Sequence, residues 1–287
     1  MNPKEINYLV IATGRTGSTL LMNLLMKNNL ATKEPTQKHY EAFHFEINPS
    51  PKLKNLDLKK FVKNTFEKHS LINNGVKISG FKVIMEQVIA LLNEYNKINK
   101  TNYSLNDFFS FFPKDLKIIR IIRKNKLQQA ISLYKANKNN LWLNQKRNYT
   151  SAKVNFNYFS IRSTLIVLNK ESKFECQVIK KNFKNYLTIC YEELCENFKS
   201  TLKNTSKYLN IEINKINSNP DLFIQRNKNS KYLYNKFISI KKKSFIDKLL
   251  TLIPDYIIHL FKYILLRRIR FLYYKYKVQN KIYKSAN

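Results

Sequence analysis

The sequence predicts an α/β fold in which a parallel sheet is flanked by helices. Two observations carry this prediction: short apolar runs of strand character recur along the chain, and three of them lead into segments with helical spacing. Such alternation is typical of a parallel sheet covered on both faces. The expected strands are 7–13, 76–84, 117–122 and 186–191. The expected helices are 18–27, 53–69, 86–96 and 149–170.

Composition gives little reason to divide the chain into several domains. At 287 residues and 44% hydrophobic content, it can bury one large core or two modest ones, and no sharp shift in composition divides it. We expect one α/β domain over 1–240 and a basic, mainly helical, amphipathic extension over 241–287. A basic amphipathic helix can lie on an anionic membrane surface, although this extension also fits a helix pair that covers the sheet.

The chain carries a net charge of +33, from 52 Lys and Arg against 19 Asp and Glu. This charge favours anionic partners such as nucleotides, glycans, nucleic acid or membrane. The charge is spread over a chain rich in Lys, Asn and Ile, as AT-rich coding DNA would produce, so it does not choose among them. No specific nucleic-acid partner is predicted.

The cysteines and apolar segments bear on the compartment. Three cysteines without a C-x-x-C pair predict neither a disulfide framework nor a zinc site. The N-terminus does not resemble a signal peptide, and the apolar segment 249–266 contains Pro254, Asp255, His259 and Lys262. We therefore expect a cytoplasmic protein, with peripheral contact on the inner membrane face as an alternative.

The turn after the first strand, Thr-Gly-Arg-Thr-Gly-Ser-Thr, has the character of an anion-binding turn. Its two glycines allow a tight turn, and the amides that follow would point from a helix N-terminus. The candidate ligands are Arg15, Thr16, Gly17, Ser18 and Thr19. The turn lacks the lysine and spacing of G-x-x-x-x-G-K-[ST] and the Rossmann G-x-G-x-x-G, which argues against kinases and dinucleotide oxidoreductases. In isolation, such a turn is also compatible with a simple tight connection.

A second candidate anchor lies in 116–142. The strand there delivers Arg123 at its carboxyl end, Asn125 can cap the next helix, and Ser132 lies two turns along on the same face. Because the carboxyl ends of parallel strands meet at one edge, this anchor and the first turn should lie together. Arg123 and Ser132 could then hold one anionic group.

Together the two segments resemble the sulfotransferase superfamily, and most of all its bacterial Stf0-type, trehalose sulfotransferase-like group. That group carries R-x-D-x-x-x-Q-A-x-S-x-x-x-A followed by Trp, and this chain matches at Arg123, Gln129, Ala130, Ser132, Ala136 and Trp142. It departs at Asn125, which replaces Asp, and at Gly14, which replaces a frequent Pro. Weaker matches are the stretches GFKV at 80–83 and CYEELC at 190–195.

The resemblance implies a P-loop-like sulfotransferase fold and the donor 3'-phosphoadenosine 5'-phosphosulfate (PAPS), with no metal. It places the 5'-phosphosulfate at the first turn, where Arg15 also serves catalysis, and the 3'-phosphate at Arg123 and Ser132. A late basic segment adds Arg226 as a nucleotide contact.

The resemblance also implies a catalytic base shortly after the first helix. The stretch KEPTQKHYEAFHF offers several candidates. We expect Glu41 to be the base, with His39 and Glu34 as alternatives. Each of these also fits a solvated loop residue.

The expected function is transfer of a sulfuryl group from PAPS to a hydroxyl of a carbohydrate, glycolipid or related small molecule. The alternative is a catalytically inactive sulfotransferase-fold protein that binds nucleic acid or anionic membrane through its basic surface. A nucleotide kinase is disfavoured because the turn has no lysine.

Overall fold

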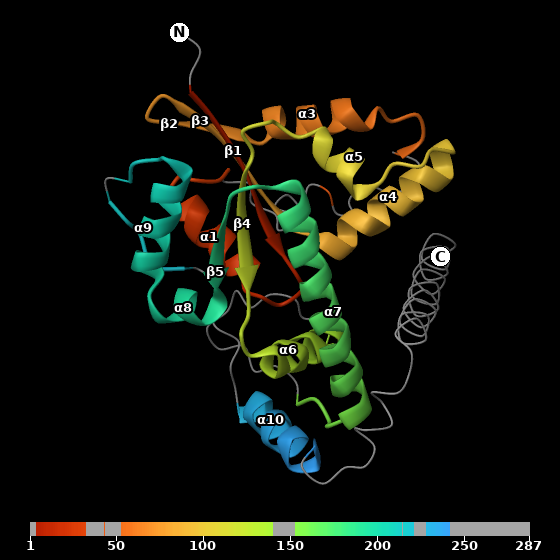
Figure 1. Cartoon of the computed structure of the whole chain (residues 1–287). Coiled ribbons are helices and arrows are strands. Elements are labelled where there is room, and N and C mark those ends of the chain that lie inside the picture. Colours follow the sequence, from red (N-terminus) through yellow and green to blue (C-terminus); the bar gives the residue numbers. More distant parts are fainter. Residues whose placement is uncertain are drawn as a thin grey trace, which may run out of the picture.

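A five-stranded sheet in the order β2-β3-β1-β4-β5 forms the centre of the computed structural model (Figure 1). The structure describes residues 4–32, 43, 53–139, 153–213, 215–220 and 228–241. The strands are β1 (Lys4–Ala12), β2 (Ser70–Asn73), β3 (Val76–Ile84), β4 (Lys117–Ile122) and β5 (Tyr186–Cys190). β1, β3, β4 and β5 run parallel, which confirms the predicted parallel sheet. β2, which was not predicted, pairs antiparallel with β3 at the edge.

Nine helices lie in the described residues, and a side-chain cap sets the start of several of them. They are α1 (Ser18–Lys27), α3 (Leu58–Lys68), α4 (Met85–Asn99), α5 (Leu105–Ser110), α6 (Lys126–Asn139), α7 (Tyr158–Asn182), α8 (Tyr191–Glu196), α9 (Phe198–Leu209) and α10 (Lys228–Lys241). The helix predicted over 53–69 begins later, because the Asp57 side chain caps α3. The helix predicted over 149–170 is also displaced: Asn157 caps α7, which continues to Asn182.

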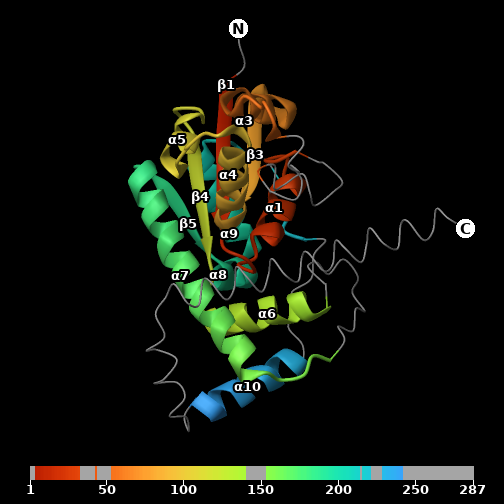
Figure 2. The same ribbon diagram turned by 90° about the vertical axis from the view of Figure 1, so that its right-hand side faces the viewer.

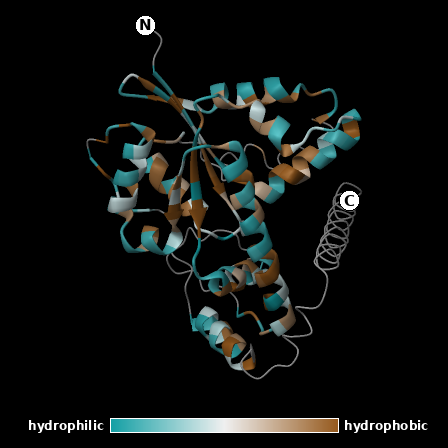
Figure 3. Cartoon of the chain, in the orientation of Figure 1, coloured by the Kyte–Doolittle hydropathy of each residue, from teal (hydrophilic) through white to brown (hydrophobic). Residues whose placement is uncertain are grey.

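Helices cover both faces of the sheet because the strands are apolar on both faces. Along β1, Tyr8, Val10 and Ala12 pack with the leucines of α1, whereas Leu9 and Ile11 face the cluster that includes α4 and α5. Figure 3 shows hydrophobic residues concentrated on the strands and on the inner sides of the helices. After two exposed residues, β1 is continuously buried from Ile6 to Ala12, the pattern expected for a central strand of a parallel sheet.

A third apolar cluster lies beyond the carboxyl ends of the strands. α6, α7 and α10 form it, and the rings of Tyr158 and Phe237 stack with centroids 4.9 Å apart. In Figures 1 and 2 the strand arrows point toward α6, and α10 lies beyond α6. This cluster places α6 against the end of the sheet where ligands of open α/β folds bind.

The order of the strands fixes where a ligand can enter. β3 lies on one side of β1 and β4 on the other, so the chain passes to opposite sides of β1 in turn. The crevice at such a switch point is the usual ligand site of an open parallel sheet. The turn after β1, singled out from the sequence, therefore opens at the switch point.

The chain after α10 was predicted to form the basic extension over 241–287. Apart from Lys241, this extension lies outside the described residues, so its boundary and its membrane contact stay predictions. Within the described residues, no helix is both long enough and apolar enough to span a membrane.

The turn from β4 into α6 is held by two side chains. The Asn125 Oδ1 accepts a hydrogen bond of 3.0 Å from the Gln128 amide, so asparagine performs the capping that aspartate would provide. The Glu192 carboxylate accepts hydrogen bonds of 3.0 and 3.1 Å from the amides of Lys124 and Asn125. α8 is thereby tied to the start of α6.

Glu192 makes this connection sensitive to pH. Burial by itself would raise the pKa of Glu192, but hydrogen bonds from the Cys190 thiol and the amides of Asn125 and Lys124 outweigh it and lower the pKa to about 2. A carboxyl with a lowered pKa stabilises the fold above its ordinary pKa, and this contribution is lost as the pH falls toward the folded-state value.

Glu192→Gln is predicted to lower the free energy of unfolding by ~1 kcal/mol at neutral pH, because charge-assisted hydrogen bonds to the turn are lost. The difference from wild type should shrink as the pH falls below about 4. Urea unfolding at about pH 7 and about pH 3 measures it. Glu193→Gln, on an exposed carboxylate paired with Lys124, is the control. A difference that is equal at the two pH values would contradict the assignment.

Candidate functional site

The backbone of the turn after β1 is built to present amides. Arg15 and Gly17 both lie in the left-handed region, with φ of 64° and 87°. For Arg15 this conformation costs roughly 1 kcal/mol, which points to a functional reason for it. α1 begins at Ser18, and Gly17 supplies no side-chain cap. The first amides of α1 therefore have no side-chain cap, an arrangement that suits the predicted binding of an anion.

The three hydroxyls predicted as donors take different positions. Thr16 is fully buried, and its Oγ1 donates a 3.0 Å hydrogen bond to the Thr13 carbonyl, so it stabilises the turn itself. Ser18 is buried at the start of α1. The Thr19 Oγ1 accepts a 2.8 Å hydrogen bond from Lys82 Nζ. The structure therefore adds a lysine to this turn that the sequence motif lacks.

α6 is tied to the turn by a fully buried glutamine. The Gln129 Nε2 donates to the Gly14 carbonyl at 2.7 Å and to the Thr13 Oγ1 at 3.1 Å. A buried amide with two such bonds fixes the distance between the turn and the helix. Gln129 was matched to the family motif in the sequence, and the structure shows that it locks the turn against α6.

Arg15, Arg123 and Ser132 meet at the carboxyl edge of the sheet. The Arg15 Nε donates to the Ser132 Oγ at 3.0 Å, and an Arg123 Nη donates to the Arg15 carbonyl at 3.4 Å. The predicted first turn and second anchor are therefore in direct contact. In this arrangement the Arg15 side chain extends toward α6, next to the residues expected to hold the 3'-phosphate.

Tyr191, at the start of α8, completes the wall of the site. Its ring lies under the Arg123 guanidinium, with the Cζ 4.5 Å from the ring centroid, a favourable cation–π geometry. The same ring fills the space beside Gly17, so that a Cβ there would overlap it. From the sequence, Tyr191 was noted at the end of the expected strand 186–191 and within a family match, but not as a site residue. The sequence carries no signal for this contact, because Gly17 and Tyr191 are brought together only by the fold.

The electrostatics of the site favour an anion. Burial and, to a smaller extent, the charge of the nearby Arg123 lower the pKa of Arg15 to about 10, with Tyr191 acting in the opposite direction. Lys135 on α6 is also buried, and burial followed by the charge of Arg15 lowers its pKa. Its Nζ donates to the Ser230 Oγ of α10 at 2.9 Å. Cations that destabilise one another in this way gain stability when an anion binds between them.

Several predicted site residues lie outside the described residues. They are the base candidates Glu34, His39 and Glu41 and the nucleotide contact Arg226. In the ranges that the structure does describe, no three His, Cys, Asp or Glu side chains are grouped as metal ligands.

Comparisons with solved structures give distant likenesses. A sulfotransferase from Alicyclobacillus acidocaldarius matches at 11% identity and a TM-score of 0.43, over 82% of this chain and 92% of that one. The sulfotransferase domain of the Synechococcus olefin synthase matches at 16% and 0.34, over 83% and 89%. The sulfotransferase domain of the curacin biosynthetic pathway matches at 12% and 0.37, over 84% and 92%. No curated protein matches this chain.

The comparison with family models covers most of the chain. The model described as Stf0 sulphotransferase matches residues 7–238, a span that includes the turn after β1, Arg123, Ser132 and α10. The family resemblance noted in the sequence is thereby confirmed. The chain belongs to the Stf0 sulfotransferase family.

Proposed function

We propose that the protein transfers a sulfuryl group from PAPS to a hydroxyl of a carbohydrate, glycolipid or related small molecule. The observation that carries the proposal is the contact between the turn after β1 and the Arg123–Ser132 anchor at the carboxyl edge. One edge of the sheet then offers two kinds of anion ligand, the α1 amides and the α6 cluster. PAPS carries anionic groups at its 5' and 3' ends, which suit such a divided site.

Sulfuryl transfer requires cations held near the leaving group and a base near the acceptor hydroxyl. In sulfuryl transfer the acceptor oxygen forms a bond to sulfur, and the bond from sulfur to the 5'-phosphate oxygen breaks. That oxygen keeps the electron pair, and adenosine 3',5'-bisphosphate departs. Donors fixed in advance, such as the α1 amides, stabilise the charge that develops. The acceptor proton passes to a base, for which Glu41 is our candidate.

The acceptor class and the compartment are also part of the proposal. Membership of the family supports a hydroxyl acceptor, and the resemblance to the Stf0-type group supports the proposal of a carbohydrate or glycolipid. We place the protein in the cytoplasm, in agreement with its three free cysteines.

Arg123→Ala is predicted to weaken binding of adenosine 3',5'-bisphosphate by about 10- to 100-fold, because a charge-assisted contact to the 3'-phosphate is lost. Calorimetric titration without magnesium, against 5'-AMP and ADP, measures it. In wild type only the bisphosphate should bind tightly.

Lys124→Ala is the matched control. Lys124 follows Arg123 directly, but its side chain is 65% exposed and pairs with Glu193, so removal of its charge should leave binding unchanged. Equal, weak binding of the three nucleotides to wild type would overturn the proposed donor site.

Glu41→Gln is predicted to keep bisphosphate binding and to lose ~100-fold or more of sulfuryl transfer, because the acceptor proton loses its base. Transfer of radiolabelled sulfate from PAPS to a panel of sugars and glycolipids provides the rate. His39→Gln and Glu34→Gln are the parallel variants. A loss confined to one of them would move the base to that residue, and full activity of all three would exclude this segment.

A further inference from the structure

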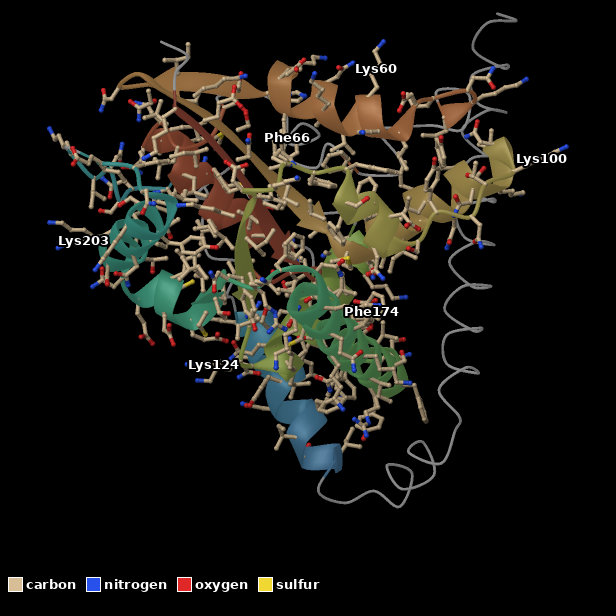
Figure 4. All side chains as sticks on the ribbon, turned by 45° about the horizontal axis from the view of Figure 1, so that its top comes forward. Lys60, Phe66, Lys100, Lys124, Phe174 and Lys203 are labelled. Atoms are coloured by element: carbon tan, nitrogen blue, oxygen red, sulfur yellow. The ribbon has the colours of Figure 1, made fainter. Side chains whose placement is uncertain are left out.

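Lys82 is a lysine in an apolar strand. It lies in β3 opposite Val10 of β1, on the sheet face that packs against α1, and only 5% of it is exposed. Lysines at the surface, such as Lys60, Lys100 and Lys203, extend away from the molecule (Figure 4). A lysine is rarely buried to this degree without a specific partner. For Lys82 the structure provides one at the start of α1, the Thr19 hydroxyl.

Thr19, which accepts the hydrogen bond from Lys82, occupies the position of a metal ligand in a P-loop. In a P-loop, the second glycine is followed by a lysine that reaches the terminal phosphates and then by a Ser or Thr whose hydroxyl binds Mg²⁺. Here Gly17 is followed by Ser18 and Thr19. Ser18 stands at the position of the P-loop lysine. Thr19 stands at the position of the metal ligand, and its hydroxyl accepts a 2.8 Å hydrogen bond from the Lys82 ammonium.

The two flanks of the turn carry different cations. Arg15 extends to Ser132 on α6, which follows β4, whereas Lys82 approaches from β3. β4 and β3 lie on opposite sides of β1. The start of α1 is therefore flanked by Lys82 on one side, and by Arg15 and Arg123 on the other.

We propose that Lys82 binds the 5'-phosphosulfate end of the donor, in the place that lysine and magnesium occupy in a P-loop, whereas Arg15 lies toward the 3'-phosphate with Arg123 and Ser132. This assignment rests on the proposed function and deepens it. When the sulfur–oxygen bond breaks, the ammonium stabilises the electron pair left on the 5'-phosphate oxygen and keeps its own proton. Magnesium is then not needed at Thr19.

A pair of nucleotides separates the two ends of the site. Adenosine 3',5'-bisphosphate and adenosine 3'-monophosphate differ only in the 5'-phosphate. In wild type the bisphosphate should bind more tightly, with or without magnesium. In Lys82→Met its affinity should fall by about 10- to 100-fold, while the affinity for the 3'-monophosphate stays within about twofold. Lys82→Arg should restore part of the difference.

A control variant and a test of folding show whether the effect is specific to Lys82. Lys117→Met removes a strand lysine at the far end of β4, where the Nζ bonds to the Tyr208 carbonyl, and should leave both affinities unchanged. Circular dichroism and thermal unfolding of Lys82→Met establish, independently of ligand binding, that the variant is folded.

The outcomes distinguish this assignment from the proposed function. Equal loss of both ligands, or no loss of the bisphosphate, in a folded Lys82→Met would overturn the role of Lys82 and leave the donor site standing. Failure of wild type to prefer either ligand over 5'-AMP would overturn both.

Discussion

Two neighbouring arginines at the carboxyl edge, the buried Arg123 and the partly buried Arg15, are the constraint on which the site depends. The Arg123 side chain donates a hydrogen bond to the Arg15 carbonyl at the carboxyl edge, and the charge of Arg123 lowers the pKa of Arg15. Burying like charges costs free energy, so the surrounding structure must hold them in place. Gln129 locks the turn to α6, and the Tyr191 ring supports Arg123. An anionic ligand would turn this cost into binding energy.

The fold supplies this constraint through its topology. Because β1, β3 and β4 are parallel, residues that follow them arrive at one edge although they are far apart in the chain. The third apolar cluster then holds α6 and α10 beyond that edge, which brings Ser132 and Lys135 into the site. The Lys135 contact with Ser230 extends the site to α10. Stability of the α6, α7 and α10 cluster and geometry of the anion site are thus linked.

Sequence periodicity was sufficient for the parallel strands and for α1, since apolar runs between turns carry a clear signal. It was also sufficient for Arg123, Asn125 and Ser132, because the end of a strand and a helix cap fix their positions. It was not sufficient for the displaced start of α7 or for β2, which is short and pairs only at an edge. Capping by single Asn or Asp residues decides such boundaries, and the sequence offers many of them.

Contacts between residues that lie far apart in the sequence could not be predicted, because the sequence patterns describe only one segment at a time. Lys82 interrupts an apolar strand, which is a signal in itself, but its partner lies 63 positions away. The Tyr191 ring can lie where it does only because Gly17 has no side chain. The sequence specifies neither the left-handed backbone of Arg15 nor the hydrogen bond that directs its side chain to Ser132 on α6. The base candidates and Arg226 lie outside the described residues and stay predictions.

The central claim is that the switch point beside β1 holds a nucleotide with two phosphate groups, one at each side of the turn. A crystal structure of the protein with adenosine 3',5'-bisphosphate tests this claim most directly. The account predicts the 5'-phosphate on the amides at the start of α1 and the 3'-phosphate within hydrogen-bonding distance of Arg123 and Ser132. A nucleotide bound away from this edge, or bound with its two phosphates exchanged, would contradict it.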